Sequence, residues 1–164
     1  MGRTKVKIYA DGSARNNPGR GGYGAIIQFM DSSGQLHEKE LSCGFIETTN
    51  NRMELLGIIR ALEKLNRPCD AEIYSDSQYV VNAFNKKWIS GWKKRNWKTS
   101  KGTPVKNKDL WERLIKQVDK HNATFSWVKG HAGNPENERC DKLATSAADG
   151  KHLIEDPGFD GSAD

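Results

Sequence analysis

The stretch Lys5–Ser13 constrains the fold of this chain more than any other. Val6, Ile8 and Ala10 alternate with polar or amphipathic residues, which is the periodicity of a β-strand with one buried face. The run ends in Asp11 and a glycine, a pair typical of turns. We therefore expect Asp11 at the carboxyl end of a strand that other elements flank.

The rest of the chain predicts a mixed α/β fold. Two further strands around a turn should complete an antiparallel meander, and the later strands need helical crossovers and should lie parallel to the first. The prediction is a mixed five-stranded sheet flanked by helices, in a single domain over residues 1–148. The strands are expected at 5–11, 23–30, 36–44, 71–74 and 124–128, and the main helices around 55–65 and at 78–84, 109–120 and 136–148.

The basic residues are concentrated in one segment. The chain has a formal net charge of +5, yet Lys86–Lys108 alone holds nine of the 26 basic residues and no acid. The remainder carries 17 basic residues against 21 acids, so one segment makes an otherwise acidic protein basic. This pattern indicates a local contact with a polyanion. Residues 149–164 hold five acids and one lysine with several glycines and a proline, and we expect them to form a mobile tail.

Other features narrow the class of protein. Hydrophobic residues make up 35% and charged residues 29%, as in globular proteins, and no apolar run approaches a membrane span. The three cysteines are far apart and form no C-x-x-C pair, which argues against a zinc site or a disulfide framework. We expect a monomer in the reducing cytoplasm.

Four acids are the candidate chemical groups: Asp11, Glu54, Asp76 and Asp141. Asp11 and Asp76 follow strands predicted to be parallel, and ligands bind beyond the carboxyl ends of such strands. Glu54 and Asp141 lie on predicted helices that can pack beside them. Clustered carboxylates raise one another's pKa values unless a cation neutralises them, and hard oxygen ligands select Mg²⁺ or Mn²⁺. Two such ions side by side promote phosphoryl transfer.

Each acid also has a structural interpretation when it is taken alone. Asp11 can be a turn residue before a glycine, and Glu54 can close a capping box that begins at Asn51. Asp76 can cap the following helix, and Asp141 can be a solvated helix residue. Their joint placement favours the shared site.

Four motifs in the chain are long, ordered and specifically spaced. They are Asp11-Gly-Ser, Thr48-Thr-Asn-Asn-Arg-Met-Glu-Leu, Ser75-Asp-Ser-Gln-Tyr and the run from Trp127 to Asp141 that contains Gly130-His-Ala-Gly. These motifs resemble those of bacterial ribonuclease HI, and the resemblance runs from about Lys5 to Ala148. It implies a ribonuclease H-like fold and an endonuclease that cuts the RNA strand of RNA–DNA hybrids, leaving 5′-phosphate and 3′-hydroxyl ends.

The resemblance also implies roles for the acids. Asp11 would bridge two Mg²⁺ ions, with Mn²⁺ as a substitute, and Asp141 would hold the ion that activates water. Glu54 and Asp76 would hold the ion at the leaving 3′-oxygen. His131 matches the family histidine that assists proton transfer or product release; without the motif it would be an ordinary loop histidine.

Substrate contacts follow from the same resemblance. Asn17, Asn50, Asn51 and Gln78 would read the minor groove of the hybrid, where the RNA 2′-hydroxyls are exposed. For Asn50 and Asn51, helix capping is a competing interpretation.

The basic segment at about 86–108 resembles the family's protruding handle. Lys93, Lys94 and Arg95 would meet phosphates. Trp88 and Trp92 with Ser100 would line a channel for the DNA strand, although the two tryptophans can equally be a packed helix face.

A further pocket would grip a phosphate of the DNA strand. Thr49 and Asn107 match two of its residues in the family. The chain has Glu47 where an arginine often stands, which should weaken this pocket.

Two other functions remain open at this level. A nuclease or strand-transfer enzyme of the same fold that acts on DNA would also use clustered acids, but it would not need the handle. A non-catalytic hybrid-binding module would have no reason to keep four mutually repelling carboxylates. Cleavage of hybrid, duplex RNA and duplex DNA side by side separates these functions.

Overall fold

A computed structural model describes residues 3–130 and 132–164 of the chain. The elements are β1 (Thr4–Ala14), β2 (Gly19–Met30), β3 (Leu36–Thr48), α1 (Asn50–Glu63), β4 (Cys69–Ser75), α2 (Gln78–Asn85), α3 (Trp88–Lys94), α4 (Lys108–Lys120), β5 (Asn122–Trp127), α5 (Pro135–Ala148) and β6 (Leu153–Ile154).

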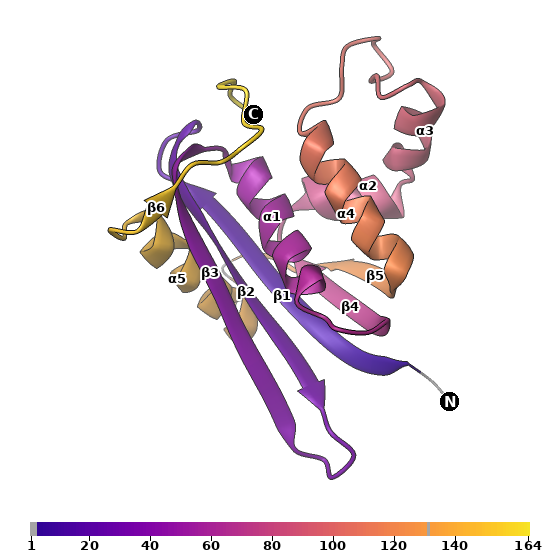
Figure 1. The fold of residues 1–164 in the computed structure, drawn as a ribbon, viewed down its shortest axis with the longest axis vertical. Helices are drawn as coiled ribbons and strands as arrows, with labels where there is room; N and C mark the ends of the chain where they lie inside the picture. The colour runs from indigo at the N-terminus through magenta and orange to yellow at the C-terminus, as the bar shows by residue number, and fades with distance from the viewer. Residues whose placement is uncertain (1–2, 131) are drawn as a thin grey trace.

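The strands form one mixed sheet in the order β5-β4-β1-β2-β3-β6 (Figure 1). β1, β2 and β3 are an antiparallel meander, whereas β4 pairs parallel to β1 and β5 parallel to β4. The predicted mixed α/β architecture is therefore confirmed. The long meander strands follow from alternating apolar residues: Val6, Ile8 and Ala10 of β1 are all buried.

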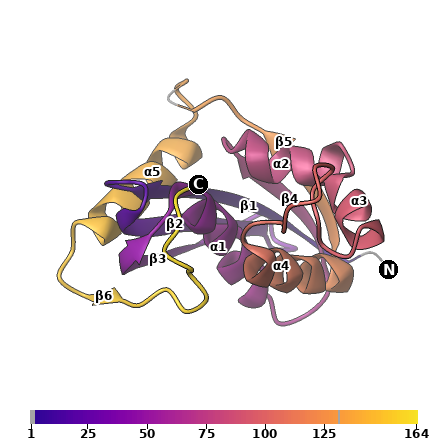
Figure 2. The same ribbon diagram turned by 90° about the horizontal axis from the view of Figure 1, so that it is seen from above.

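Helices cover both faces of the sheet. α5 packs on one face of β1, β2 and β3, while α1, α2 and α4 lie on the opposite face (Figure 2). Glycine permits the close approach of α5, because a Cβ at Gly24 would lie 2.4 Å from the carbonyl oxygen of Cys140. The main core lies between the sheet and α1.

Helix α1 is the central helix of this core. Leu55, Ile58, Ile59 and Leu62 are fully buried, as the spacing of apolar residues in the sequence predicts. The helix begins after Thr49, whose hydroxyl accepts the backbone N–H of Arg52 at 3.3 Å. This start places Glu54 in the second turn, close to β1.

The structure corrects one expectation. The sheet has six strands instead of five, because Leu153 and Ile154 pair parallel to Gly44 and Phe45 at the edge of β3. The segment after α5 crosses the edge of the sheet and runs back over the start of α1, where it makes polar contacts (Figure 1). The mobility of residues 149–164 stays a prediction. Within residues 3–130 and 132–164, no helix is both long and apolar enough to cross a membrane.

Candidate active site

The register of two parallel strands brings Asp11 and Asp76 together. β1 and β4 pair up to Ala10 and Ser75, so Asp11 is the next residue on β1 and Asp76 is the first residue after β4. β1 itself continues to Ala14 in its pairing with β2, and Asp11 is therefore a strand residue and not part of a turn. The predicted strand end at Asp11 is therefore wrong for β1 itself, but both acids lie where the parallel pairing of β1 with β4 stops.

Glu54 reaches the same place from α1. Its helix lies so close to β1 that a Cβ at Gly12 would be 2.4 Å from the backbone nitrogen of Glu54. Only glycine permits this contact, which explains why Gly12 follows Asp11. Each of Asp11, Glu54 and Asp76 offers a carboxylate oxygen, and these oxygens lie within 4.8 Å of one another.

The structure excludes two of the structural interpretations of these acids. Thr49, not Asn51, caps α1, so Glu54 does not belong to a capping box. Ser77 caps α2 by accepting the backbone N–H of Val80, so Asp76 is not the cap. A shared chemical role remains for both acids.

The cluster is electrostatically unfavourable without a cation. Burial raises the pKa of Asp11 to about 7, and the charges of Asp76 and Asp141 add to the rise, although a hydrogen bond with Glu54 opposes it. Burial likewise raises the pKa of Glu54 well above its usual value, and the charges of Asp11 and Asp76 act in the same direction. A bound cation would reverse this effect by favouring the ionised forms.

The donor atoms of this cluster fit a divalent metal ion. Among the described residues, Oε2 of Glu54 is buried and has no hydrogen-bond partner, which is costly unless a ligand satisfies it. Its neighbours are carboxylate oxygens, the donors that Mg²⁺ prefers. Asp141, half-buried on α5, is not in this group of three, but its charge contributes to the raised pKa of Asp11.

The loop before α5 approaches the cluster. A Cβ at Gly130 would lie 2.9 Å from Oδ2 of Asp76, so the backbone of this loop passes directly beside that carboxylate. Trp127 Nε1 donates to the backbone oxygen of Asp76 at 3.1 Å. His131, expected at this point, lies outside the described residues, and its role stays a prediction.

The four amides predicted to contact substrate have different surroundings. Asn50 ties β1 to α1, because its Oδ1 accepts the backbone N–H of Ala14 at 2.7 Å. This is a structural contact, but it is not the helix capping considered for Asn50, since Thr49 caps α1. Asn17 accepts the backbone N–H of Asn50 at 2.9 Å. Asn17 and Gln78 are exposed, and Asn51 is partly exposed at the start of α1.

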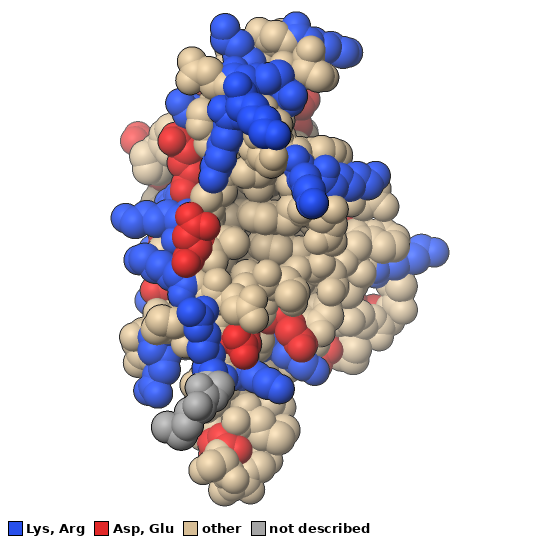
Figure 3. All heavy atoms as spheres, turned by 90° about the vertical axis from the view of Figure 1, so that its right-hand side faces the viewer, with Lys and Arg blue, Asp and Glu red and all other residues tan. Residues whose placement is uncertain are grey.

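The basic segment forms a protruding handle, residues 86–108, that includes α3. Lysine and arginine side chains gather over this end of the molecule (Figure 3). Lys93, Lys94, Arg95 and Ser100 are exposed.

The two tryptophans of α3 differ in their surroundings. Trp92 packs between Trp97 and Trp111, with ring centroids 6.2 and 5.1 Å away. Trp88 is 38% exposed. The packed-face interpretation thus describes Trp92 better than Trp88.

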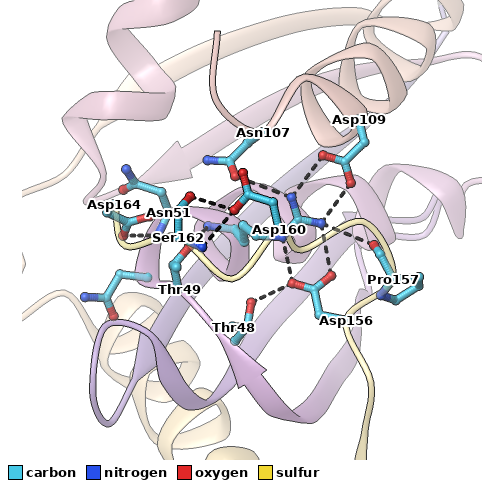
Figure 4. Close-up of polar contacts among 12 residues, drawn as sticks. Thr48, Thr49, Asn51, Asn107, Asp109, Asp156, Pro157, Asp160, Ser162 and Asp164 are labelled. Atoms are coloured by element: carbon cyan, nitrogen blue, oxygen red, sulfur yellow. Dashed lines mark hydrogen bonds and ion pairs between the residues drawn. The ribbon is translucent and has the colours of Figure 1, made fainter. Parts of the chain in front are cut away.

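Thr49, at the start of α1, and Asn107, at the start of α4, are both labelled in Figure 4. Both contact Arg52, a residue that was not predicted from the sequence: its backbone N–H donates to the Thr49 hydroxyl at 3.3 Å and its guanidinium group to Oδ1 of Asn107 at 3.3 Å. The sequence feature that could have revealed Arg52 is a positively charged residue within a predicted helix whose neighbouring residues are buried. Glu47 is exposed on β3, and its effect on this pocket stays a prediction.

A mixed sheet with carboxylates gathered beyond its parallel strands defines a class of α/β proteins equipped to hold divalent cations for phosphoryl transfer. Comparison with known proteins narrows the class. Residues 3–149 match the RNase H family. The chain therefore belongs to the RNase H family.

Relatives and solved structures agree with this assignment. Ribonuclease H of Lachnoclostridium phytofermentans is 58% identical over 153 residues, which cover 93% of this chain and 97% of the relative. Ribonuclease H of Pseudoalteromonas atlantica is 54% identical over 156 residues, or 95% and 98% of the two chains.

Two solved structures resemble the fold. LC9-RNase H1, described as a type 1 RNase H with the type 2 active-site motif, has a TM-score of 0.82 and 28% identity, with 96% of this chain and 80% of the other covered. LC11-RNase H1, solved in complex with an RNA/DNA hybrid, has a TM-score of 0.65 and 26% identity, with 88% and 96% covered.

Proposed function

We propose that this protein is an endonuclease that hydrolyses the RNA strand of RNA–DNA hybrids and leaves 5′-phosphate and 3′-hydroxyl ends. The observation that carries the proposal is the cluster of Asp11, Glu54 and Asp76, with a buried oxygen of Glu54 that lacks a partner among the described residues. Membership of the RNase H family and the hybrid bound to LC11-RNase H1 support the substrate.

The acids would hold two Mg²⁺ ions, with Mn²⁺ as a substitute. Asp11, Glu54 and Asp76 supply oxygens within 4.8 Å of one another, and Asp141 adds a fourth carboxylate nearby. When bound, such ions supply an activated water and stabilise the charge that develops on the leaving oxygen. The protein's own contribution is to fix these carboxylates by strand register and by the close contact at Gly12. His131 would assist proton transfer or product release.

Two surfaces would bind the hybrid. The exposed amides of Asn17 and Gln78, with Asn50 and Asn51 at the start of α1, would face the minor groove. The DNA strand would pass Trp88, Trp92 and Ser100 on the handle and place a phosphate at Thr49 and Asn107. The charges of Lys93, Lys94 and Arg95 would supply affinity that does not depend on sequence.

The protein would act as a cytoplasmic monomer. Cys43, Cys69 and Cys140 are free thiols in the described structure, which suits a reducing compartment. Mass measurement in solution tests the monomer, and localisation of the tagged protein tests the compartment.

Cleavage with and without Mg²⁺, on hybrid, duplex RNA and duplex DNA of one sequence, tests the function. We expect Mg²⁺-dependent cleavage of the hybrid alone. Asp11→Asn should abolish it, because the most buried acid of the cluster would lose its charge, while hybrid binding should persist or improve. Near-normal turnover of this variant, or equal cleavage of duplex DNA, would contradict the proposal.

A further inference from the structure

The last residues of the chain lie on the surface proposed to bind the hybrid. The segment after α5 is fixed by β6 and then by Asp156, whose side chain is 2% exposed and pairs with Arg52 at 2.7 Å. Thr48 Oγ1 also donates to Asp156 at 2.7 Å. From this anchor the chain turns across the start of α1 and ends in residues 160–164, here called the terminal loop (Figure 4).

The terminal loop binds two of the residues proposed to contact the hybrid. Oδ2 of Asp164 accepts the side-chain amide of Asn17 at 2.9 Å and the backbone N–H of Asn51 at 3.0 Å. The ammonium group of Lys106, in the basic segment, donates to the backbone oxygen of Ala163. In Figure 4 the loop lies beside Thr49 and Asn107, on the pocket proposed for the DNA phosphate.

The terminal loop contains a turn and carries two acidic side chains, Asp160 and Asp164. Oδ1 of Asp160 accepts the backbone N–H and the hydroxyl of Ser162, at 2.8 and 2.6 Å, which closes a turn. The backbone N–H groups at the start of α1 favour an anion, because the helix dipole is positive at this end, and Lys106 adds a positive charge nearby. The Asp164 carboxylate accepts hydrogen bonds from donors that could otherwise bind a phosphate or an acceptor in the minor groove.

We propose that the terminal loop is an intramolecular competitor of the hybrid, with Asp164 occupying the donors of Asn17 and Asn51 until the substrate displaces it. The proposal rests on the proposed function of this surface. The carboxylate cluster of Asp11, Glu54 and Asp76 is not part of the contact. The loop therefore lowers affinity for the hybrid and leaves the maximal rate unchanged.

The size of the effect depends on how often the loop is docked. A loop docked in about 70 to 90% of molecules weakens apparent affinity by about three- to tenfold, because only the open fraction binds. Deleting residues 160–164, with the anchor at Asp156 kept, should tighten binding by that factor. Asp164→Asn should tighten it less, because the amide oxygen still accepts a hydrogen bond but carries no charge.

A matched control is available on the same segment. Glu155 is exposed and makes no hydrogen bond or ion pair within the described residues, so Glu155→Gln removes one charge without touching the contact. Affinity for a fluorescent RNA–DNA hybrid is measured by anisotropy in EDTA, where no metal-dependent cleavage occurs. The backbone amide signal of Asn51 in the free protein reports docking, and it should shift in the deletion variant and in Asp164→Asn but not in Glu155→Gln.

The outcomes are distinct. Tighter binding by the deletion variant and Asp164→Asn, with Glu155→Gln unchanged, supports the proposal. Unchanged or weaker binding after deletion overturns it, as does equal tightening by Glu155→Gln, which would indicate a general charge effect. A protein that binds the hybrid but never cleaves it would refute the proposed function instead, while the binding data would still decide the role of the loop.

Discussion

At the scale of single residues, the active site depends on a buried carboxylate that holds its proton near neutral pH. Burial and neighbouring acids raise the pKa of Asp11 from 3.8 to about 7. Between these two values the folded protein binds a proton that the unfolded chain has released. The contribution of Asp11 to stability is therefore fully present below pH 3.8 and is lost as the pH rises through about 7.

We expect Asp11→Asn to stabilise the metal-free protein at neutral pH. Asparagine does not titrate, so the difference in free energy of unfolding, variant minus wild type, should rise between pH 4 and 7 by about 2 to 4 kcal/mol, since one pKa unit corresponds to about 1.4 kcal/mol. Glu54 adds in the same direction, because the variant removes a charge that raises its pKa. Urea unfolding in EDTA across this range measures the difference.

Added Mg²⁺ supplies the control. It should stabilise the wild type more than Asp11→Asn above pH 7, because the ion favours the ionised carboxylates. Parallel stability curves for the two proteins from pH 4 to 8 would show that Asp11 does not titrate as proposed.

The sequence predicted that Asp11 and Asp76 lie together because each follows an alternating or apolar run, although β1 continues past Asp11 to Ala14. The parallel register of β1 and β4 brings the two acids side by side. Arg52 was not found in this way. Its burial depends on Asp109 and Asp156, which lie 57 and 104 residues further along the chain, and no local pattern reveals partners so remote.

At the scale of elements, the handle combines a packed base with a charged surface. Ile89 is the buried residue of α3, and Trp92 anchors the helix against Trp97 and Trp111. Lys93 and Lys94, which follow Trp92, are exposed and can meet phosphates without disturbing this packing. Arg95 is also exposed, but its Nε donates to the backbone oxygen of Lys98 at 3.0 Å and so takes part in the fold of the handle.

Neutralising Lys93, Lys94 and Arg95 together to glutamine should raise the Michaelis constant for the hybrid and leave the maximal rate largely intact. The slope of log affinity against log salt should become shallower by about 2 to 3, because each lost phosphate contact removes close to one counterion. Steady-state cleavage over a salt series measures both quantities.

The control removes three exposed lysines elsewhere: Lys5, Lys116 and Lys120. It lowers the net charge equally but should change the salt slope much less. If the handle variant instead loses maximal rate at an unchanged Michaelis constant, the handle acts at the reacting centre and not through phosphate attraction.

The elements that sequence reasoning missed have a physical explanation. β6 has two residues, too few for any periodicity, and it exists because the edge of β3 offers unpaired backbone groups at Gly44 and Phe45. The same segment is acidic and rich in glycine, a composition typical of mobile chains, and no local pattern predicts its contact with α1. That contact is made by Arg52, whose guanidinium group donates to Asp156 at 2.7 Å.

At the scale of the whole molecule, Arg52 joins three distant parts of the fold. Its guanidinium group donates to Asp109 at the start of α4 at 2.8 and 2.9 Å, and to Asp156 of the C-terminal segment at 2.7 and 3.0 Å. Both the arginine and the Asp156 side chains are 2% exposed. This network fixes the start of α1, where Thr49 and Asn51 lie, relative to the segment that carries the terminal loop.

Asp156→Asn should destabilise the protein by about 2 to 4 kcal/mol, because it leaves part of a buried positive charge uncompensated. The retained pair with Asp109 keeps the loss from being larger. The same variant should loosen the terminal loop and tighten hybrid binding under conditions where the protein is fully folded. Urea unfolding and anisotropy measure the two effects.

Asp149→Asn is the matched control, because Asp149 pairs with Arg15 at the surface, where both side chains are about half exposed. Exposed pairs contribute little, so neither stability nor affinity should change measurably. If Asp156→Asn lowers stability but leaves hybrid affinity unchanged, the anchor serves the fold alone and the terminal loop docks without it. Equal effects of the two substitutions on stability would mean that burial of Asp156 does not strengthen its pairing with Arg52.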